Sequence, residues 1–314
     1  MDAIPIIYVL FIARWIHFAA LFVLFGSSFF WFYMGREQSS AGYGGLPRTR
    51  RATIILMRVA APIAAISGIL WLAGILANMT GGFDNVADPA TLRLFFFQTA
   101  FGPVAISRLA LLATAIAVIL LPMKDRTRLS TLAAVGALLL INQAWLGHAA
   151  EGGAGLYGAL MIAAYGVHLL AAGAWVGGLP PLLFALVEER NFNPNEARLW
   201  TLDTLSRYSV MGMVAVTLII ISGIANAGFR VAGSFGRLFD TFYGEVLFAK
   251  IGVVMAMLAL AYVNRFVLMP ELRTASFNGL TQARTLRRSA TFELVLGILV
   301  LAVAAVLGIA PPPQ

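Results

Sequence analysis

Three histidines are the only imidazoles in this chain, and their positions favour metal or haem chemistry. His17 and His168 each lie inside a long apolar stretch, and His148 ends another one. Imidazole nitrogens bind copper, zinc and iron, and an ionisable side chain in an apolar membrane helix is a functional candidate by default. The chain contains no cysteine, which leaves histidine, methionine and carboxylates as possible metal ligands. For any one histidine alone, an interhelical hydrogen bond is the competing interpretation.

Met161 is a further candidate ligand. It precedes His168 by seven residues, so a helix places both on one face about two turns apart. A thioether above an imidazole suits Cu(I) better than most other metals. The competing interpretation is a gap-filling core residue, because the chain has 11 methionines.

The composition shows which elements must position these residues. The 314 residues are 60% hydrophobic and 11% charged, with a mean hydropathy of +0.87, which predicts a polytopic membrane protein. A hydrocarbon layer of about 30 Å takes roughly 20 residues of helix. Eight continuous apolar runs meet that length, and none alternates as barrel strands do. They predict an all-α bundle of eight transmembrane helices: Ile6–Tyr33, Ala52–Met79, Gly102–Leu121, Leu129–His148, Tyr157–Val187, Tyr208–Val231, Tyr243–Leu268 and Ser289–Ile309.

The basic residues fall mainly on one side of this bundle. Loops after the first, third, fifth and seventh runs hold most of the lysines and arginines, whereas the opposite loops hold only Arg93, Arg230 and Arg237. Cytoplasmic loops carry such an excess, so the asymmetry places both termini outside. The net charge of +8 is therefore read as a topology signal, and no nucleic-acid partner is expected.

This topology assigns a depth to each histidine. His17 and His168 each lie about 11 residues from the outer end of their helix, or roughly 16 Å down at 1.5 Å per residue. They share one level near the bilayer midplane, and His148 belongs at the outer surface. The helix that carries His168 continues into Gly177, Gly178, Pro180 and Pro181, which are expected to weaken or kink it. Such a kink fits either a discontinuous transport helix or kinked packing without transport.

Three membrane cations complicate a path for a metal cation. Arg14, Arg108 and Lys250 lie roughly 9–12 Å below the outer face. They can snorkel to the headgroups, pair with Glu245 or Asp240, or bind the propionates of a haem. Because two histidines at one depth also suit axial ligation, the alternative function is a b-type haem-binding electron carrier or oxidoreductase using His17 and His168. A structural protein without any ligand is a third interpretation.

Several segments resemble the CopD-type copper-resistance and copper-import proteins of bacterial inner membranes. They are RWIHFAALFVLFGSSFF, WLGHAAEGG, HLLAAGAWVGGLPPLL, SGIANA, YGEVLFAKIG and YVNR, which span most of the chain in this order. The resemblance implies one integral-membrane CopD-like domain over residues 1–314, with eight helices and periplasmic termini in the bacterial inner membrane.

The resemblance also implies a function. A CopD-like protein is a transporter, not an enzyme, and acts in copper homeostasis and resistance. It takes a copper ion, Cu(I) or Cu(II), from the periplasm and passes it inward. A separate CopC-like periplasmic carrier is the expected protein partner, beside membrane lipid. By position, the copper ligands are His17, His148 and His168, with Met161 between the outer and deep sites.

Overall fold

The computed structural model describes residues 3–34, 46–146, 153, 155–188, 194–231, 235–274 and 279–310. Every regular element in these residues is helical, which confirms the all-α prediction. The elements are α1 (Ala3–Phe22), η1 (Val23–Ser27), α2 (Ser28–Met34), α3 (Pro47–Thr80), α4 (Pro89–Gln98), α5 (Gly102–Leu120), α6 (Asp125–Asn142), η2 (Gln143–Leu146), α7 (Leu156–Glu188), α8 (Pro194–Val231), η5 (Phe235–Asp240), α9 (Phe242–Val263), η6 (Asn264–Leu268), α10 (Met269–Thr274) and α11 (Gly279–Leu307).

Seven helices among the described residues are long and apolar enough to cross a membrane. Two of them are composite, because α1, η1 and α2 run on as one helix and α9 continues through η6 into α10. The sequence predicts an eighth helix over 129–148, where the structure has α6 and η2. With 18 residues and three charges in its first turn, α6 is less apolar than the other seven. The multi-pass membrane class is therefore confirmed, and the count of spanning helices by length and composition is seven.

Several helices are longer than the apolar runs that predict them. α8 begins at Pro194 and α11 at Gly279, well before the predicted starts at Tyr208 and Ser289. The added turns are rich in polar and charged residues, because a helix that leaves the hydrocarbon layer can continue in water with its backbone hydrogen bonds intact. The hydropathy boundary marks the membrane surface and not the helix end.

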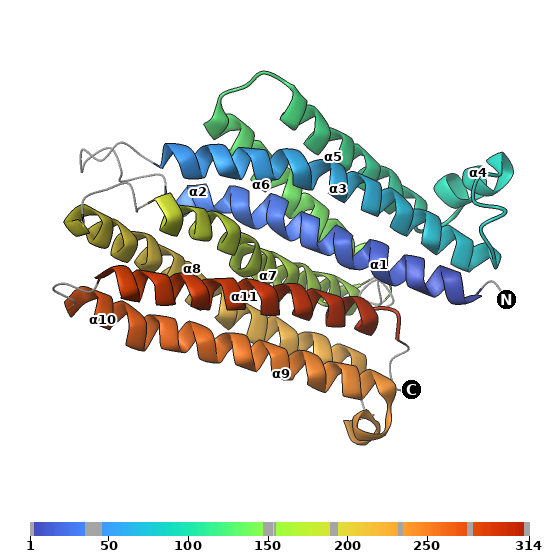
Figure 1. The fold of residues 1–314 in the computed structure, drawn as a ribbon. Helices are drawn as coiled ribbons and strands as arrows, with labels where there is room; N and C mark the ends of the chain where they lie inside the picture. Colours follow the sequence, from blue (N-terminus) through green and yellow to red (C-terminus); the bar gives the residue numbers. More distant parts are fainter. Residues whose placement is uncertain are drawn as a thin grey trace.

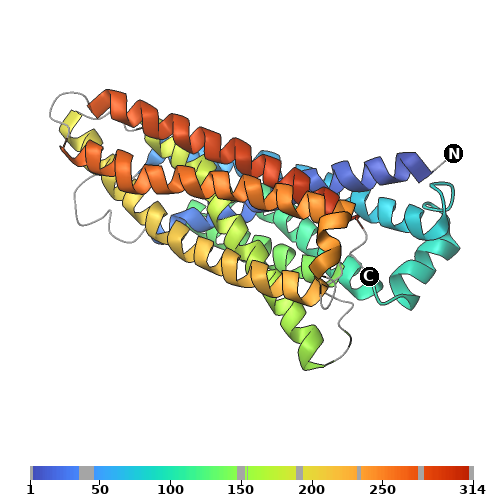
Figure 2. The same ribbon diagram turned by 90° about the horizontal axis from the view of Figure 1, so that it is seen from below.

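The helices run side by side in one elongated bundle (Figure 1). α1 packs along α3, α7 along α8, and α9 along α11. Figure 2 shows α9 in orange beside α11 in red, as Figure 1 does. α1 begins and α11 ends toward the same end of the bundle (Figure 1).

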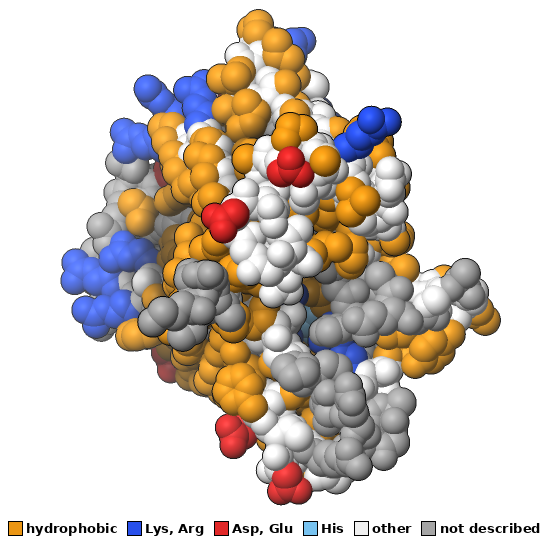
Figure 3. Space-filling view, turned by 90° about the vertical axis from the view of Figure 1, so that its right-hand side faces the viewer, with side chains coloured by type: hydrophobic (Ala, Val, Ile, Leu, Met, Phe, Trp, Pro, Cys, Tyr) orange, Lys and Arg blue, Asp and Glu red, His pale blue; other side chains and the backbone are white. Residues whose placement is uncertain are grey.

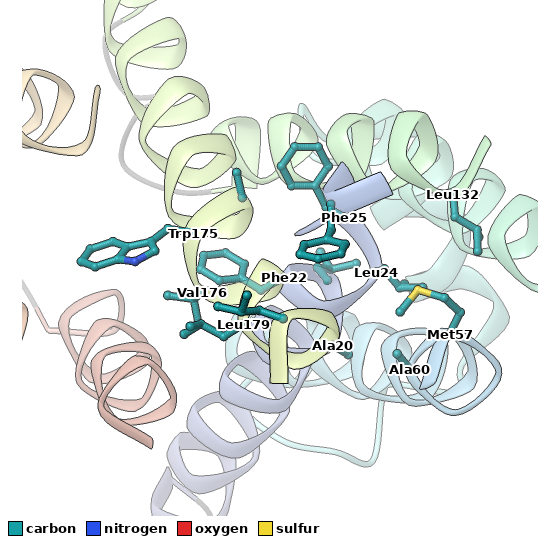
Figure 4. Close-up of a cluster of buried hydrophobic side chains, with 14 of the residues drawn as sticks. Ala20, Phe22, Leu24, Phe25, Met57, Ala60, Leu132, Trp175, Val176 and Leu179 are labelled. Atoms are coloured by element: carbon teal, nitrogen blue, oxygen red, sulfur yellow. The ribbon is translucent and has the colours of Figure 1, made fainter. Parts of the chain in front are cut away.

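α7 is the central helix of the bundle. In its most apolar stretch 67% of the residues are buried, against 11% for α8 and 6% for α9. Val176 and Leu179 of α7 lie beside Phe22 of the first spanning helix, and the ring of Trp175 points to the other side (Figure 4). The exposed apolar side chains of α8 and α9 form a surface suited to lipid.

The prolines of α7 do not break it, because the helix runs unbroken from Leu156 to Glu188. Pro181 has no N–H, so the carbonyl of Gly177, four residues earlier, loses its helical donor. The hydroxyl of Ser27 donates to that carbonyl at 2.7 Å. This bond from η1 lies at the contact between the two helices that carry His17 and His168.

Candidate functional site

The helix contact at Gly26 and Gly177 supports the predicted common depth of the two histidines. A Cβ on Gly177 would lie 1.8 Å from the carbonyl oxygen of Phe22, so these backbones touch. Gly26 follows His17 by nine residues, and Gly177 follows His168 by nine. Since α1 and α7 run in the same direction (Figure 1), equal spacing from one contact places both rings at a similar height.

His17 is fully buried on α1 and both of its ring nitrogens are occupied. Nδ1 lies 2.9 Å from the carbonyl oxygen of Ala64 on α3. A carbonyl only accepts, so Nδ1 carries the proton and Nε2 presents a lone pair. Nη1 of Arg108 lies 2.8 Å from Nε2 and donates to it. His17 is thus a neutral imidazole whose one lone pair faces a guanidinium.

Arg108 does not snorkel to the headgroups, because it is fully buried. Its Nε donates to Oδ1 of Asn142 on α6 at 3.0 Å, and Asn142 in turn donates to Ser107 at 2.9 Å. The ring of Trp71 lies 5.1 Å from the guanidinium carbon, within range of a cation–π interaction. Helices α1, α3, α5 and α6 together hold this one cation against His17.

Four cations gather around this region. Arg14 interacts electrostatically with Arg108, Arg230 and Lys250. None of them forms an ion pair with a carboxylate in the part of the chain that the structure describes. The expected pairing with Glu245 or Asp240 is therefore not present there. Arg14 donates to the carbonyl of Gly308 at 2.9 Å and lies over Phe18 and Trp71.

Figure 3 views the bundle from the end at which α1 begins, and it shows a recess near the centre. A histidine and a basic side chain are visible inside it. Two buried donors of the cation cluster, Nε of Arg14 and Nη2 of Arg108, have no hydrogen-bond partner in the described part of the chain. The positive charge inside the bundle is only partly compensated, which opposes entry of a metal cation unless a ligand or a movement of Arg108 offsets it.

His168 differs from His17 in that, among the described residues, a hydrogen-bond partner is found for only one of its ring nitrogens. Its Nδ1 lies 3.1 Å from the hydroxyl oxygen of Ser222 on α8. That hydroxyl donates its own proton to the carbonyl of Leu218, so it accepts from Nδ1–H. The lone pair of Nε2 is then left available, in the tautomer and fixed orientation that a metal-binding histidine needs. The cation that interacts electrostatically with His168 is Lys250.

Met161 adds no contact to this geometry among the described residues. Met161 is buried on α7, and no contact joins its sulfur to a histidine among the described residues. His148 lies outside the described residues. No group of three or more histidine, cysteine or carboxylate side chains gathers in the described part of the chain. The structure therefore presents His168 and His17 as separate candidates and not as one completed metal cage.

The hydrogen-bond partners of the two histidine side chains, Ser222 and Arg108, are not predicted by the sequence analysis. Ser222 belongs to the SGIANA segment, but nothing in that segment alone points it at His168. Arg108 is visible as a membrane cation, yet its contact with His17 crosses 91 positions of sequence. The only sequence signal was that both are polar residues in apolar runs.

Comparison with known proteins gives consistent matches along the chain. Residues 1–159 match the family model described as "Copper resistance protein D-like, N-terminal domain", and residues 202–307 match "Copper resistance protein D". The chain is 31% identical over 311 residues to the copper transport protein CutJ of Bacillus subtilis, covering 96% of this chain and 52% of that protein. It thus spans about half the length of CutJ.

Two other relatives are matched over most of their length. Copper resistance protein D of Pseudomonas syringae pv. tomato is 28% identical over 305 residues, 95% of each chain. The inner membrane protein YebZ of Escherichia coli is 27% identical over 265 residues, covering 83% of this chain and 84% of that protein. No solved structure matches the chain.

Proposed function

The chain belongs to the copper resistance protein D family, and we propose that it imports copper ions across the bacterial inner membrane. In this proposal it acts in copper homeostasis and resistance as a transporter and not as an enzyme. The membrane potential drives the cation inward, at about 2.3 kcal/mol per charge and 100 mV.

The observation that carries this proposal is the state of His168. Ser222 holds its Nδ1–H, so the Nε2 lone pair is available to a metal. A histidine that served only to join two helices would need no second nitrogen free in the membrane. A single imidazole lone pair at this depth would bind a copper ion weakly, so the transported ion could also be released.

His17 is the second deep ligand in the proposed path. Its Nε2 is held by Arg108, so copper binds there only when the guanidinium moves away. Arg108 then acts as a gate between an empty and a loaded site. We propose that His148 receives copper at the outer mouth and that Met161 lies on the way inward, which gives the order His148, Met161, then His168 with His17.

The same topology proposal gives both termini to the periplasm. α1 begins and α11 ends at one end of the bundle (Figure 1), so the chain crosses an even number of times, and α6 supplies the eighth crossing. One core cluster includes residues from Phe18 on α1 to Leu301 on α11, which supports a single domain over 1–314. A separate CopC-like carrier delivers copper to the outer end, and lipid surrounds the bundle.

Copper analysis and an absorption spectrum of purified protein test the proposal. Wild type should retain copper through desalting, and His168→Ala should bind it at least about tenfold more weakly. His168→Gln is the matched control for folding, because its amide can still donate to Ser222 while lacking the imidazole. Equal copper binding by wild type and His168→Ala would overturn the site. A Soret band that disappears in His17→Ala and His168→Ala would identify a haem protein instead.

A variant of Ser222 tests the orienting hydrogen bond. Ser222→Ala should lower copper affinity roughly tenfold, because the second partner of a ligating histidine fixes its tautomer and ring orientation. Competition against a chromogenic copper chelator measures this. Thr217→Ala is the control, since that hydroxyl on the same helix bonds only the carbonyl of Met213. An affinity unchanged by Ser222→Ala would show that Ser222 does not orient His168.

A further inference from the structure

A cavity of about 350 Å³ lies away from the histidines, between α7, α8, α9, η6, α10 and α11. Its lining is mainly apolar, with Glu293, Asn264 and Tyr208 among its polar side chains. By the proposed topology it lies in the inner half of the membrane. A second cavity is lined by Ser206, Arg265, Phe266, Met269 and Pro270, and it shares Arg265, Phe266 and Met269 with the first.

Glu293 is buried in this cavity with only 3% of its surface exposed. The amide of Asn264 donates to its Oε1, and Trp175 of α7 lies within hydrogen-bonding reach. Oδ1 of Asn264 is buried without a partner. Glu293 and Asn264 therefore each have an oxygen atom facing the cavity, where no counter-ion is found among the described residues.

The surrounding charges do not neutralise Glu293. On α8 the titratable group of the lining is Tyr208, whose hydroxyl donates to the carbonyl of Trp175. On α9 it is Tyr262. On η6 it is Arg265, which donates to Ser209 and lies over the ring of Phe266. Among the described residues no ion pair joins Arg265 to Glu293, and α7 and α10 contribute no titratable group to the lining.

A carboxylate without a counter-ion is costly in an apolar membrane cavity. The cost falls when the group carries a proton, since the neutral acid still accepts from Asn264. By the proposed topology the second cavity, which adjoins the first at Arg265 and Met269, lies on the inner side of Glu293. η6 is a π-helical turn, a feature that is frequent at functional sites.

We propose that Glu293 is a proton-binding site that exchanges its proton with the inner side. Its O–H bond breaks when a copper cation enters the inner half, and the proton passes to water in the second cavity. The carboxylate left behind offsets the charge of the ion. The link to copper rests on the proposed transport function, whereas the bound proton does not.

Infrared spectroscopy of reconstituted protein tests the bound proton. Wild type at neutral pH should show a carboxylic acid C=O band that shifts in D₂O, and Glu293→Gln should lose it. Glu188→Gln is the control and should keep the band, since Glu188 does not line this cavity and accepts from the backbone N–H groups of Arg48 and Thr49 at 3.0 and 2.7 Å. A spectrum of wild type identical to that of Glu293→Gln would overturn the proton site.

Vesicles containing a pH-sensitive dye test the exchange. The first copper ion to enter each wild-type protein should release the Glu293 proton into the vesicle, which is seen as a transient acidification because the site later takes a proton back from the same side. Glu293→Gln should lose this transient while retaining copper binding at His168. Copper entry with the same pH change in both proteins would overturn the exchange. Vesicles that take up no copper would overturn the transport function instead, and the infrared band would still decide the proton site.

Discussion

Gly177→Ala is expected to destabilise the protein by about 3 kcal/mol or more, the upper range for overpacking a closely packed interior. A Cβ there would lie 1.8 Å from the carbonyl oxygen of Phe22 and 3.1 Å from Cα of Gly26. Both are backbone atoms, so no side chain can rotate away. The first spanning helix and α7 would have to separate, and the Ser27 bond to the Gly177 carbonyl would break with them.

The melting temperature and size-exclusion profile of the purified protein measure this effect. Gly166→Ala is the matched control, because it lies on the same helix and a Cβ there meets nothing within 4 Å. That variant should melt at or above the wild-type temperature, since alanine favours a helix by up to about 1 kcal/mol over glycine. A Gly177→Ala protein as stable as Gly166→Ala would show that the helices do not cross so closely.

Arg108→Met is expected to raise copper affinity by at least about tenfold. The guanidinium lies 2.8 Å from Nε2 of His17, so copper must displace it and then remain close to its charge. Two unit charges 4 Å apart repel by about 4 kcal/mol at an effective dielectric constant of 20. Methionine fills much of the same volume without charge, a replacement that buried ionic sites often tolerate.

Chelator competition on purified variants measures this gain. Arg108→Lys keeps a cation beside His17 and should show no increase. Arg108→Met combined with His17→Ala should lose the gain, because the freed ligand is gone. A folded Arg108→Met protein with wild-type affinity would contradict the gating role of Arg108, and a gain that persists without His17 would place its effect elsewhere.

Much of the fold is predictable from local pattern. Apolar runs of the right length gave the spanning helices, and Gly102–Leu121 differs from α5 by one residue. The fourth run is harder to judge, because α6 begins with charges and ends at a short 3₁₀ turn. The effect of Pro180 and Pro181 on the helix could not be predicted from the sequence. Pro181 lacks the N–H that would donate to the carbonyl of Gly177, and only the packed structure shows that the hydroxyl of Ser27 donates in its place.

The sequence by itself determined that this is a multi-pass helical membrane protein, and it predicts that His17 and His168 lie at similar depth. These properties follow from hydropathy and from the fixed rise of a helix, both of which are local. Only the tertiary structure decided how the rings of His17 and His168 are bonded. Ala64 and Arg108 occupy both nitrogens of His17, whereas Ser222 holds one nitrogen of His168. In lipid, close packing and interhelical hydrogen bonds set how each helix is rotated, and a single sequence does not encode those partners in any local pattern.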